Sequence, residues 1–284
     1  MRTEKIWFKS GETDLSGSLY IPDAIPETVA VLNGATGVPQ GYYSAFASWL
    51  ADARGIVCLT YDYRDFGASA QKPLRLSKAT MSDWALEDQP AARHELCRRF
   101  PDARMWVIGH SLGGMLMPMQ GDLSDIDRLI TVASGRVNVR NHPWPYQGLA
   151  RLFWFGHVPL VTRLLGYLPG RAVGLGADLP ADLYWQWRRW CTHPDFYFGD
   201  QTMILPDPHW PESIPAELIA LSDDPVCPRR AVDALAEIYG RGAKTRVLDP
   251  AAFGLKSIGH LAAFARRNAA VWPALLDGQE VRAT

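Results

Sequence analysis

The stretch Gly109-His-Ser-Leu-Gly113 constrains the fold of this chain more than any other part of its sequence. The residues before it, 104–108, read as a buried strand, and Met115-Leu-Met117 after it can begin a helix. A serine at so tight a turn has a strained backbone, and bulk two residues away on either side would collide with neighbouring elements. Glycine at both positions removes that bulk. Ser111 is then exposed above a sheet at the positive end of a helix, as a nucleophilic serine requires.

Apolar runs alternate with helical segments along most of the chain. The first two runs, Ile6-Trp-Phe8 and residues 15–22, suggest an antiparallel opening hairpin. Continuous apolar strands that alternate with helices predict a parallel sheet covered on both faces. We expect strands at 28–32, 56–61, 104–108, 128–133, 217–221 and 245–248, and helices at 43–53, 84–100, 229–239 and 261–275.

This alternation stops between about Gly135 and Trp210, where six of the eleven tryptophans fall and prolines and glycines are dense. The six are Trp144, Trp154, Trp185, Trp187, Trp190 and Trp210. A connection of this length inside a compact domain is usually a functional lid or an inserted subdomain. We therefore expect a core made of residues 1–134 and 211–284 and a Trp-rich lid at 135–210. The aromatic side chains either fill the core of the lid or face the site below it.

Composition and charge exclude several classes of protein. The net charge is −1 and no long run of one sign occurs, so nothing indicates a nucleic-acid partner. The N-terminal residues lack the apolar core of a signal peptide, and no apolar run of about 18 residues could span a membrane. Four scattered cysteines, Cys58, Cys97, Cys191 and Cys227, lack metal-ligand spacing and favour free thiols over disulfides. These observations predict a cytoplasmic protein with no membrane insertion, metal or cofactor.

These features resemble the α/β-hydrolase superfamily over almost the whole chain. Tyr61-Asp-Tyr-Arg-Asp-Phe-Gly-Ala-Ser69 looks like the Asp-x-Arg-Gly-x-Gly-x-Ser turn of that superfamily, with Asp65 in place of its first glycine. Asn33-Gly-Ala-Thr-Gly-Val-Pro-Gln40 is similar to a loop of uncharacterised bacterial serine hydrolases near the serine-aminopeptidase and monoacylglycerol-lipase branch. The resemblance implies an α/β-hydrolase fold, with a mostly parallel eight-stranded sheet, helices on both faces and an inserted lid.

The resemblance also implies a base and an acid that follow the serine in the order acid, then histidine. Of the seven histidines, His260 alone follows a late strand end just before the closing helix. The acid is expected in the loop that begins at Leu221, where Asp224 is favoured over Asp223, which can instead cap the turn. Ser111 would then be the nucleophile, His260 the base, and Asp224 the group that orients the base.

A tetrahedral intermediate also needs hydrogen-bond donors for its oxyanion. One is expected to be the backbone N–H of Leu112, which follows the nucleophile. The other should come from the loop after the strand at 28–32, where we favour Ala35, with Thr36 as the alternative. Asn33 stands where many relatives have histidine.

The predicted function is hydrolysis of a carboxylic ester with an apolar acyl or aromatic group, through a Ser111 acyl-enzyme. The expected partner is a small apolar molecule, because lidded pockets rich in tryptophan are mostly apolar. Thioesterase, peptidase, C–C hydrolase and acyltransferase activities use the same three residues and stay open, as does the oligomeric state. Two further classes are a non-catalytic ligand-binding protein, which the complete set of three residues disfavours, and a protein that docks on lipid surfaces.

Overall fold

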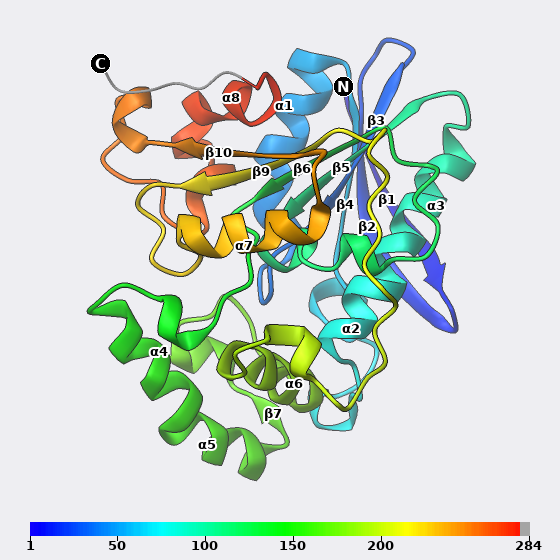
Figure 1. Ribbon diagram of the computed structural model, residues 1–284. Coiled ribbons are helices and arrows are strands. Elements are labelled where there is room, and N and C mark those ends of the chain that lie inside the picture. The colour runs from blue at the N-terminus through cyan, green and yellow to red at the C-terminus, as the bar shows by residue number, and fades with distance from the viewer. Residues whose placement is uncertain (279–284) are drawn as a thin grey trace.

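An eight-stranded sheet runs through the computed structural model, which describes residues 1–278 (Figure 1). Its strands lie in the order β1-β2-β4-β3-β5-β6-β9-β10. Their bounds are β1 (Arg2–Ser10), β2 (Thr13–Ile21), β3 (Thr28–Asn33), β4 (Val57–Tyr61), β5 (Arg104–His110), β6 (Arg128–Val132), β9 (Ala216–Leu221) and β10 (Ala243–Leu248). The first two strands form the predicted antiparallel hairpin, β2 pairs antiparallel with β4, and the strands from β4 to β10 are parallel.

Burial along the strands matches their positions in the sheet. Every residue of β3 and β4 is buried, because helices cover both faces of the central strands. The edge strand β1 instead alternates buried and exposed residues over its second half. The prediction of a mostly parallel eight-stranded sheet is therefore confirmed.

Helices lie on both faces of the sheet. On one face, α1 (Ser44–Arg54) packs against α8 (Trp272–Leu276), with the rings of Phe46 and Trp272 5.6 Å apart. The opposite face carries α3 (Gln89–Arg99), which contacts β1, β3 and β4, and α7 (Arg229–Tyr239), which contacts β9 and β10 (Figure 1). The predicted core extends to residue 284, and its last six positions, 279–284, lie outside the described residues.

Two predicted helices are shorter than their apolar patterns suggest. After Ser111 the chain forms two 3₁₀ turns, Ser111–Gly114 and Met117–Met119, in place of a regular α-helix. Adjacent glycines and Pro118, which disfavours a helical conformation at the residue before it, account for the difference. The expected closing helix is likewise a series of 3₁₀ turns, and only α8 is α-helical. Ala265 is extended there, and the Asn268 side chain donates to the Ala262 carbonyl over 3.0 Å.

The expected helix at 84–100 is irregular at its start. It follows α2 (Met81–Asp83), and residues Trp84–Asp88 form a π-helical turn before α3 begins. Pro90 has no N–H to bond the carbonyl four residues earlier, which explains the local change of hydrogen-bond pattern.

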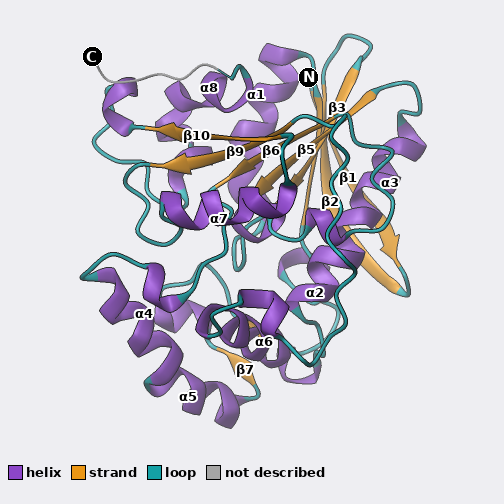
Figure 2. Ribbon diagram, viewed as in Figure 1, coloured by secondary structure: helices purple, strands orange, loops and turns teal. Residues whose placement is uncertain are grey.

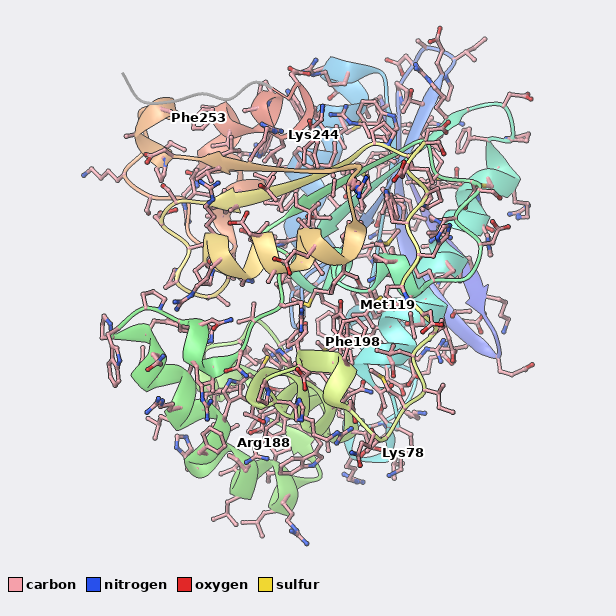
Figure 3. All side chains as sticks on the ribbon, viewed as in Figure 1. Lys78, Met119, Arg188, Phe198, Lys244 and Phe253 are labelled. Carbon is pink, nitrogen blue, oxygen red and sulfur yellow. The ribbon has the colours of Figure 1, made fainter. Side chains whose placement is uncertain are left out.

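The residues between β6 and β9, here called the β6–β9 segment, form a group of helices apart from the sheet (Figure 2). Its elements are α4 (Tyr146–Phe155), α5 (His157–Leu165), β7 (Tyr167–Leu168), β8 (Leu179–Pro180) and α6 (Ala181–Thr192). Arg188 of α6 lies among these helices (Figure 3) and donates to the Trp154 carbonyl over 2.7 Å. Trp154 and Trp190 are buried inside the segment, whereas Trp144 is exposed. These tryptophans therefore divide between packing and surface.

Candidate active site

Ser111 lies at the sharp turn between β5 and the first 3₁₀ turn, with φ +53°. A Cβ on Gly109 would lie 2.5 Å from the Gly113 carbonyl oxygen. A Cβ on Gly113 would lie 2.1 Å from the carbonyl oxygen of Asn33 on the neighbouring strand. Both distances are too short for any side chain, so the two glycines allow the turn that holds the Ser111 hydroxyl above the sheet.

The structure brings Ser111, His260 and Asp224 together in one hydrogen-bonded row. His260 Nε2 is 3.1 Å from Ser111 Oγ, and His260 Nδ1 is 2.8 Å from Asp224 Oδ2. Because an ionised carboxylate only accepts, Nδ1 carries the proton, and Nε2 is free to accept the proton of the Ser111 hydroxyl. The row has the geometry of a nucleophile, a base and an orienting acid.

Asp224 is held as a carboxylate. Burial raises the pKa of its carboxyl group, but His260 and the N–H groups of Cys227 and Val226 outweigh that effect, so the pKa lies below its usual value. Its second oxygen, Oδ1, accepts from Val226 at 2.8 Å and from Cys227 at 3.0 Å. The side chain is therefore fixed from both sides.

Asp223, the alternative acid, contacts backbone N–H groups instead of the His260 ring. Its carboxylate accepts from the backbone N–H groups of Ile258 at 2.8 Å and Gly259 at 3.0 Å. It thus anchors the loop that carries His260, while Asp224 contacts the His260 ring. Both carboxylates therefore position His260: Asp223 holds the backbone before it, and Asp224 holds its ring.

The two expected oxyanion donors, Leu112 and Ala35, differ in whether their N–H groups are already hydrogen-bonded. Leu112 is the second residue of the 3₁₀ turn after β5, where an N–H has no acceptor within the helix. The N–H of Ala35, in contrast, donates to the Tyr43 hydroxyl over 2.8 Å. This corrects the expectation for Ala35, because the sequence does not show that a tyrosine from the following helical turn takes its donor. Thr36, the alternative, lines the same cavity as Ser111.

Behind the row lies a buried network that sequence reasoning missed. The His110 ring contacts the His260 carbonyl oxygen through Nε2 at 2.9 Å and the Tyr43 hydroxyl through Nδ1 at 2.9 Å. Since a carbonyl only accepts, Nε2 carries the proton, Tyr43 donates to Nδ1, and the Tyr43 oxygen accepts from Ala35. Burial, with a smaller contribution from His260, lowers the pKa of His110 to about 3, which keeps this ring neutral.

A cavity of about 730 Å³ opens beside Ser111 and His260. Aromatic side chains of the β6–β9 segment form much of its wall, among them Phe153, Trp154 and Trp187. Leu149 and Leu152 of α4 line the same cavity. Few polar groups interrupt this apolar lining, so the cavity suits an apolar group placed next to the serine hydroxyl.

A family model described as the alpha/beta hydrolase family matches residues 29–274 of the chain. This match spans most of the sequence and includes all three members of the row. The chain belongs to the alpha/beta hydrolase family. The resemblance seen in the sequence is therefore confirmed.

Solved structures agree on the fold of this alpha/beta hydrolase. An alpha-beta serine hydrolase homologue from Coxiella burnetii is 13% identical over 98% of each chain, with a TM-score of 0.57. The esterase domain of a Rhodothermus marinus protein is 16% identical over 97% of this chain and 96% of that chain, with a TM-score of 0.57. A highly thermostable carboxyl esterase from Bacillus coagulans is 19% identical over 88% of this chain and 90% of that chain, with a TM-score of 0.52. No curated protein matches the chain significantly.

The loop after β4 departs from the hydrolase motif at Asp65 but keeps a glycine-like backbone. Asp65 has φ +56°, in the left-handed region that glycine favours. Its carboxylate accepts from the Ser77 hydroxyl at 2.6 Å and pairs with Lys72 at 3.2 Å. These contacts hold a conformation that would otherwise strain a residue with a side chain.

Residues 1–278 of this hydrolase carry neither a metal-binding cluster nor a membrane-spanning helix. No group of three or more histidines, cysteines, aspartates or glutamates there could hold a metal ion. None of the described helices is both long enough and apolar enough to cross a membrane. All four cysteines are free thiols.

Proposed function

We propose that this hydrolase cleaves carboxylic esters through an acyl-enzyme formed on Ser111. The observation that carries the proposal is the continuous row from Ser111 Oγ through His260 to Asp224, with contacts of 3.1 and 2.8 Å. A serine hydroxyl is a weak nucleophile until a base within hydrogen-bond reach accepts its proton. His260 meets that requirement, and the ionised Asp224 stabilises the imidazolium that forms.

In the first half of the proposed reaction, Ser111 Oγ attacks the ester carbonyl carbon as His260 Nε2 takes the hydroxyl proton. The carbonyl oxygen becomes an oxyanion, stabilised by the N–H of Leu112 and, in place of the already bonded Ala35, the N–H of Thr36. Collapse of the intermediate breaks the bond to the alcohol, which leaves with the proton from His260. The acyl group is now attached to Ser111.

In the second half, His260 takes a proton from water as the water oxygen attacks the acyl carbon. A second oxyanion forms at the same donors and collapses, the carboxylic acid leaves, and Ser111 recovers its proton from His260. The sum of the two halves is ester plus water giving acid plus alcohol.

The apolar cavity supports an acyl or aromatic group as the part of the substrate next to Ser111. Phe153, Trp154 and Trp187 come from the β6–β9 segment, so we propose that residues 135–210 act as a lid whose aromatic side chains shape this pocket. Cys191 and Val158, at its wall, add further apolar surface. Removal of this surface from water on binding supplies the affinity for an apolar group.

Ester hydrolysis is preferred over the alternatives because two of the similar solved structures are described as an esterase domain and a carboxyl esterase. Thioester hydrolysis, peptide hydrolysis and acyl transfer use the same row of residues. A non-catalytic ligand-binding protein would not need His260 within 3.1 Å of Ser111 Oγ.

A side-by-side panel of p-nitrophenyl esters of increasing chain length, thioesters and aminoacyl amides tests this proposal. We expect turnover of the esters to exceed that of the amides and to rise with acyl length until the cavity is filled. Ser111→Ala should lose turnover by several orders of magnitude. Faster turnover of the amides, or near-normal activity in Ser111→Ala, would contradict the proposal.

A further inference from the structure

The helices α4 and α5 carry a group of exposed apolar side chains. Its members, here called the α4–α5 patch, are Leu149, Leu152, Phe155, Leu160, Leu164 and Leu165. Leu160 and Leu164, one helical turn apart, are 61% and 75% exposed. The two helices pack against each other at the end of the molecule remote from the sheet (Figure 1). So many exposed leucines on two helices that pack against each other indicate a binding face.

The charged side chains of α4 and α5 themselves are both arginines, Arg151 and Arg163. Within the β6–β9 segment, residues 135–177 contain five arginines and no aspartate or glutamate, although the whole chain has a net charge of −1. Arg151 and Arg163 are exposed on α4 and α5, and Arg171 is exposed just beyond them. Within the described part of the chain, none of these three guanidinium groups forms an ion pair. Arg188 adds a fourth cation, 5.2 Å from the centre of the Phe155 ring.

The patch also joins the cavity beside Ser111. Leu149 and Leu152 are 62% and 54% exposed, and both line the cavity. Leu149 and Leu152 therefore connect the patch with the cavity that contains Ser111.

These observations favour a lipid surface over a second copy of the chain. A two-fold interface would place the patch against itself and bring arginines together without an acid among the patch residues to pair them. An anionic bilayer offers both an apolar layer for the leucines and negative headgroups for the arginines. Asp178, the first acid after this stretch, accepts from the Arg171 backbone N–H over 3.1 Å.

We propose that the α4–α5 patch docks reversibly on anionic phospholipid surfaces and delivers apolar esters from them to Ser111. The delivery step rests on the proposed esterase function, whereas the docking step does not. The leucines enter the headgroup boundary, and Arg151, Arg163 and Arg171 contact the phosphates. Each arginine near such a surface strengthens binding about fivefold, so the three together contribute about a hundredfold.

Sedimentation with phosphatidylcholine vesicles, with and without phosphatidylglycerol, tests the docking step. The wild type should sediment with the anionic vesicles, and salt should weaken the binding. Leu160→Glu/Leu164→Glu should lower the partition coefficient at least about tenfold, and Arg151→Gln/Arg163→Gln/Arg171→Gln about a hundredfold. Ile25→Glu/Ile204→Glu, which changes two residues that are 94% and 97% exposed elsewhere, is the matched control and should bind as the wild type does.

Hydrolysis of water-soluble p-nitrophenyl acetate separates this inference from the proposed function. Leu160→Glu/Leu164→Glu should hydrolyse it at the wild-type rate, because neither leucine lines the cavity. Vesicle binding without any hydrolysis by the wild type would contradict the esterase proposal but leave the docking intact. Absent vesicle binding, equal binding to neutral vesicles, unimpaired binding by the leucine variant, or a wild-type dimer that this variant dissociates would each overturn the docking proposal.

Discussion

At the scale of single residues, His260 is positioned by three independent contacts. Asp224 accepts from its ring at 2.8 Å, Asp223 accepts from the two backbone N–H groups before it, and the His110 ring donates to its carbonyl oxygen. Ring orientation, loop position and backbone direction are therefore controlled by different side chains. The sequence predicted Ser111, His260 and Asp224 from their order and spacing, but the roles of Asp223 and His110 depend on contacts between distant segments.

The two neighbouring aspartates provide a matched pair of variants. Asp224→Asn should lower kcat for a p-nitrophenyl ester by about 10⁴-fold, because an amide cannot hold the tautomer that leaves Nε2 free to accept. Asp223→Asn keeps an acceptor for the loop and should lower kcat by no more than about tenfold. Steady-state kinetics of both variants checks this difference. Equal losses in the two variants would contradict the separate roles assigned to the two carboxylates.

The buried His110 ring predicts a pH dependence of stability. Its pKa is about 3 in the folded protein and about 6.5 in the unfolded chain. Below about pH 6.5 the unfolded chain binds a proton that the folded protein excludes. The free energy of unfolding should therefore decrease as the pH is lowered, with the slope expected for uptake of one proton on unfolding. His110→Phe should lose this part of the slope between about pH 6.5 and about pH 3.

Urea unfolding of the wild type and His110→Phe over this pH range measures that slope. The exposed His94, changed to Gln, is the control and should leave the slope of the wild type unchanged. Parallel curves of unfolding free energy against pH for the wild type and His110→Phe would show that His110 binds protons equally in the folded and unfolded protein. That result would contradict the claim that burial keeps the His110 ring neutral.

At the scale of elements, the strands were predictable and the helix around the serine was not. Long and mostly apolar runs determine β3, β4 and β5, because central strands of a parallel sheet are covered on both faces. The two 3₁₀ turns after Ser111 instead form because Gly113, Gly114 and Pro118 together disfavour a regular α-helix. In the same way, glycines indicate the loop after β3 that is expected to hold an oxyanion donor, but the hydrogen bond from Ala35 to Tyr43 depends on how the 3₁₀ turn Gln40–Tyr43 packs.

The close approach of the sharp turn at Ser111 to β3 predicts a large difference between two glycine substitutions. Gly113→Ala places a Cβ 2.1 Å from the Asn33 carbonyl oxygen, a backbone atom that cannot move away alone, and should cost at least about 3 kcal/mol of stability. Gly121→Ala meets no atom within 4 Å and should be neutral or slightly stabilising. Thermal unfolding of both variants tests the prediction. Similar melting temperatures for the two variants would contradict this close contact between the turn and β3.

At the scale of the whole molecule, the carboxyl ends of the parallel strands bring the distant parts of the site together. Ser111 follows β5, Asp224 follows β9 and His260 follows β10, so the order of strands in the sheet determines which loops meet. That order was predictable from the alternating pattern and the resemblance. The helices within the β6–β9 segment were not, although its position along the chain was, because its aromatic residues serve packing, cavity wall and surface without a periodic pattern. The reaction is therefore better defined by the sequence than the substrate.

Labelling with a fluorophosphonate probe, followed by mass spectrometry of the modified peptide, tests the central claim most directly. The probe reacts with an activated serine, so the wild type should gain one label on Ser111, while Ser111→Ala should gain none and His260→Ala should react far more slowly. A wild type that stays unlabelled under conditions that label a known esterase, or a label on another residue, would contradict the account of Ser111 as the activated nucleophile.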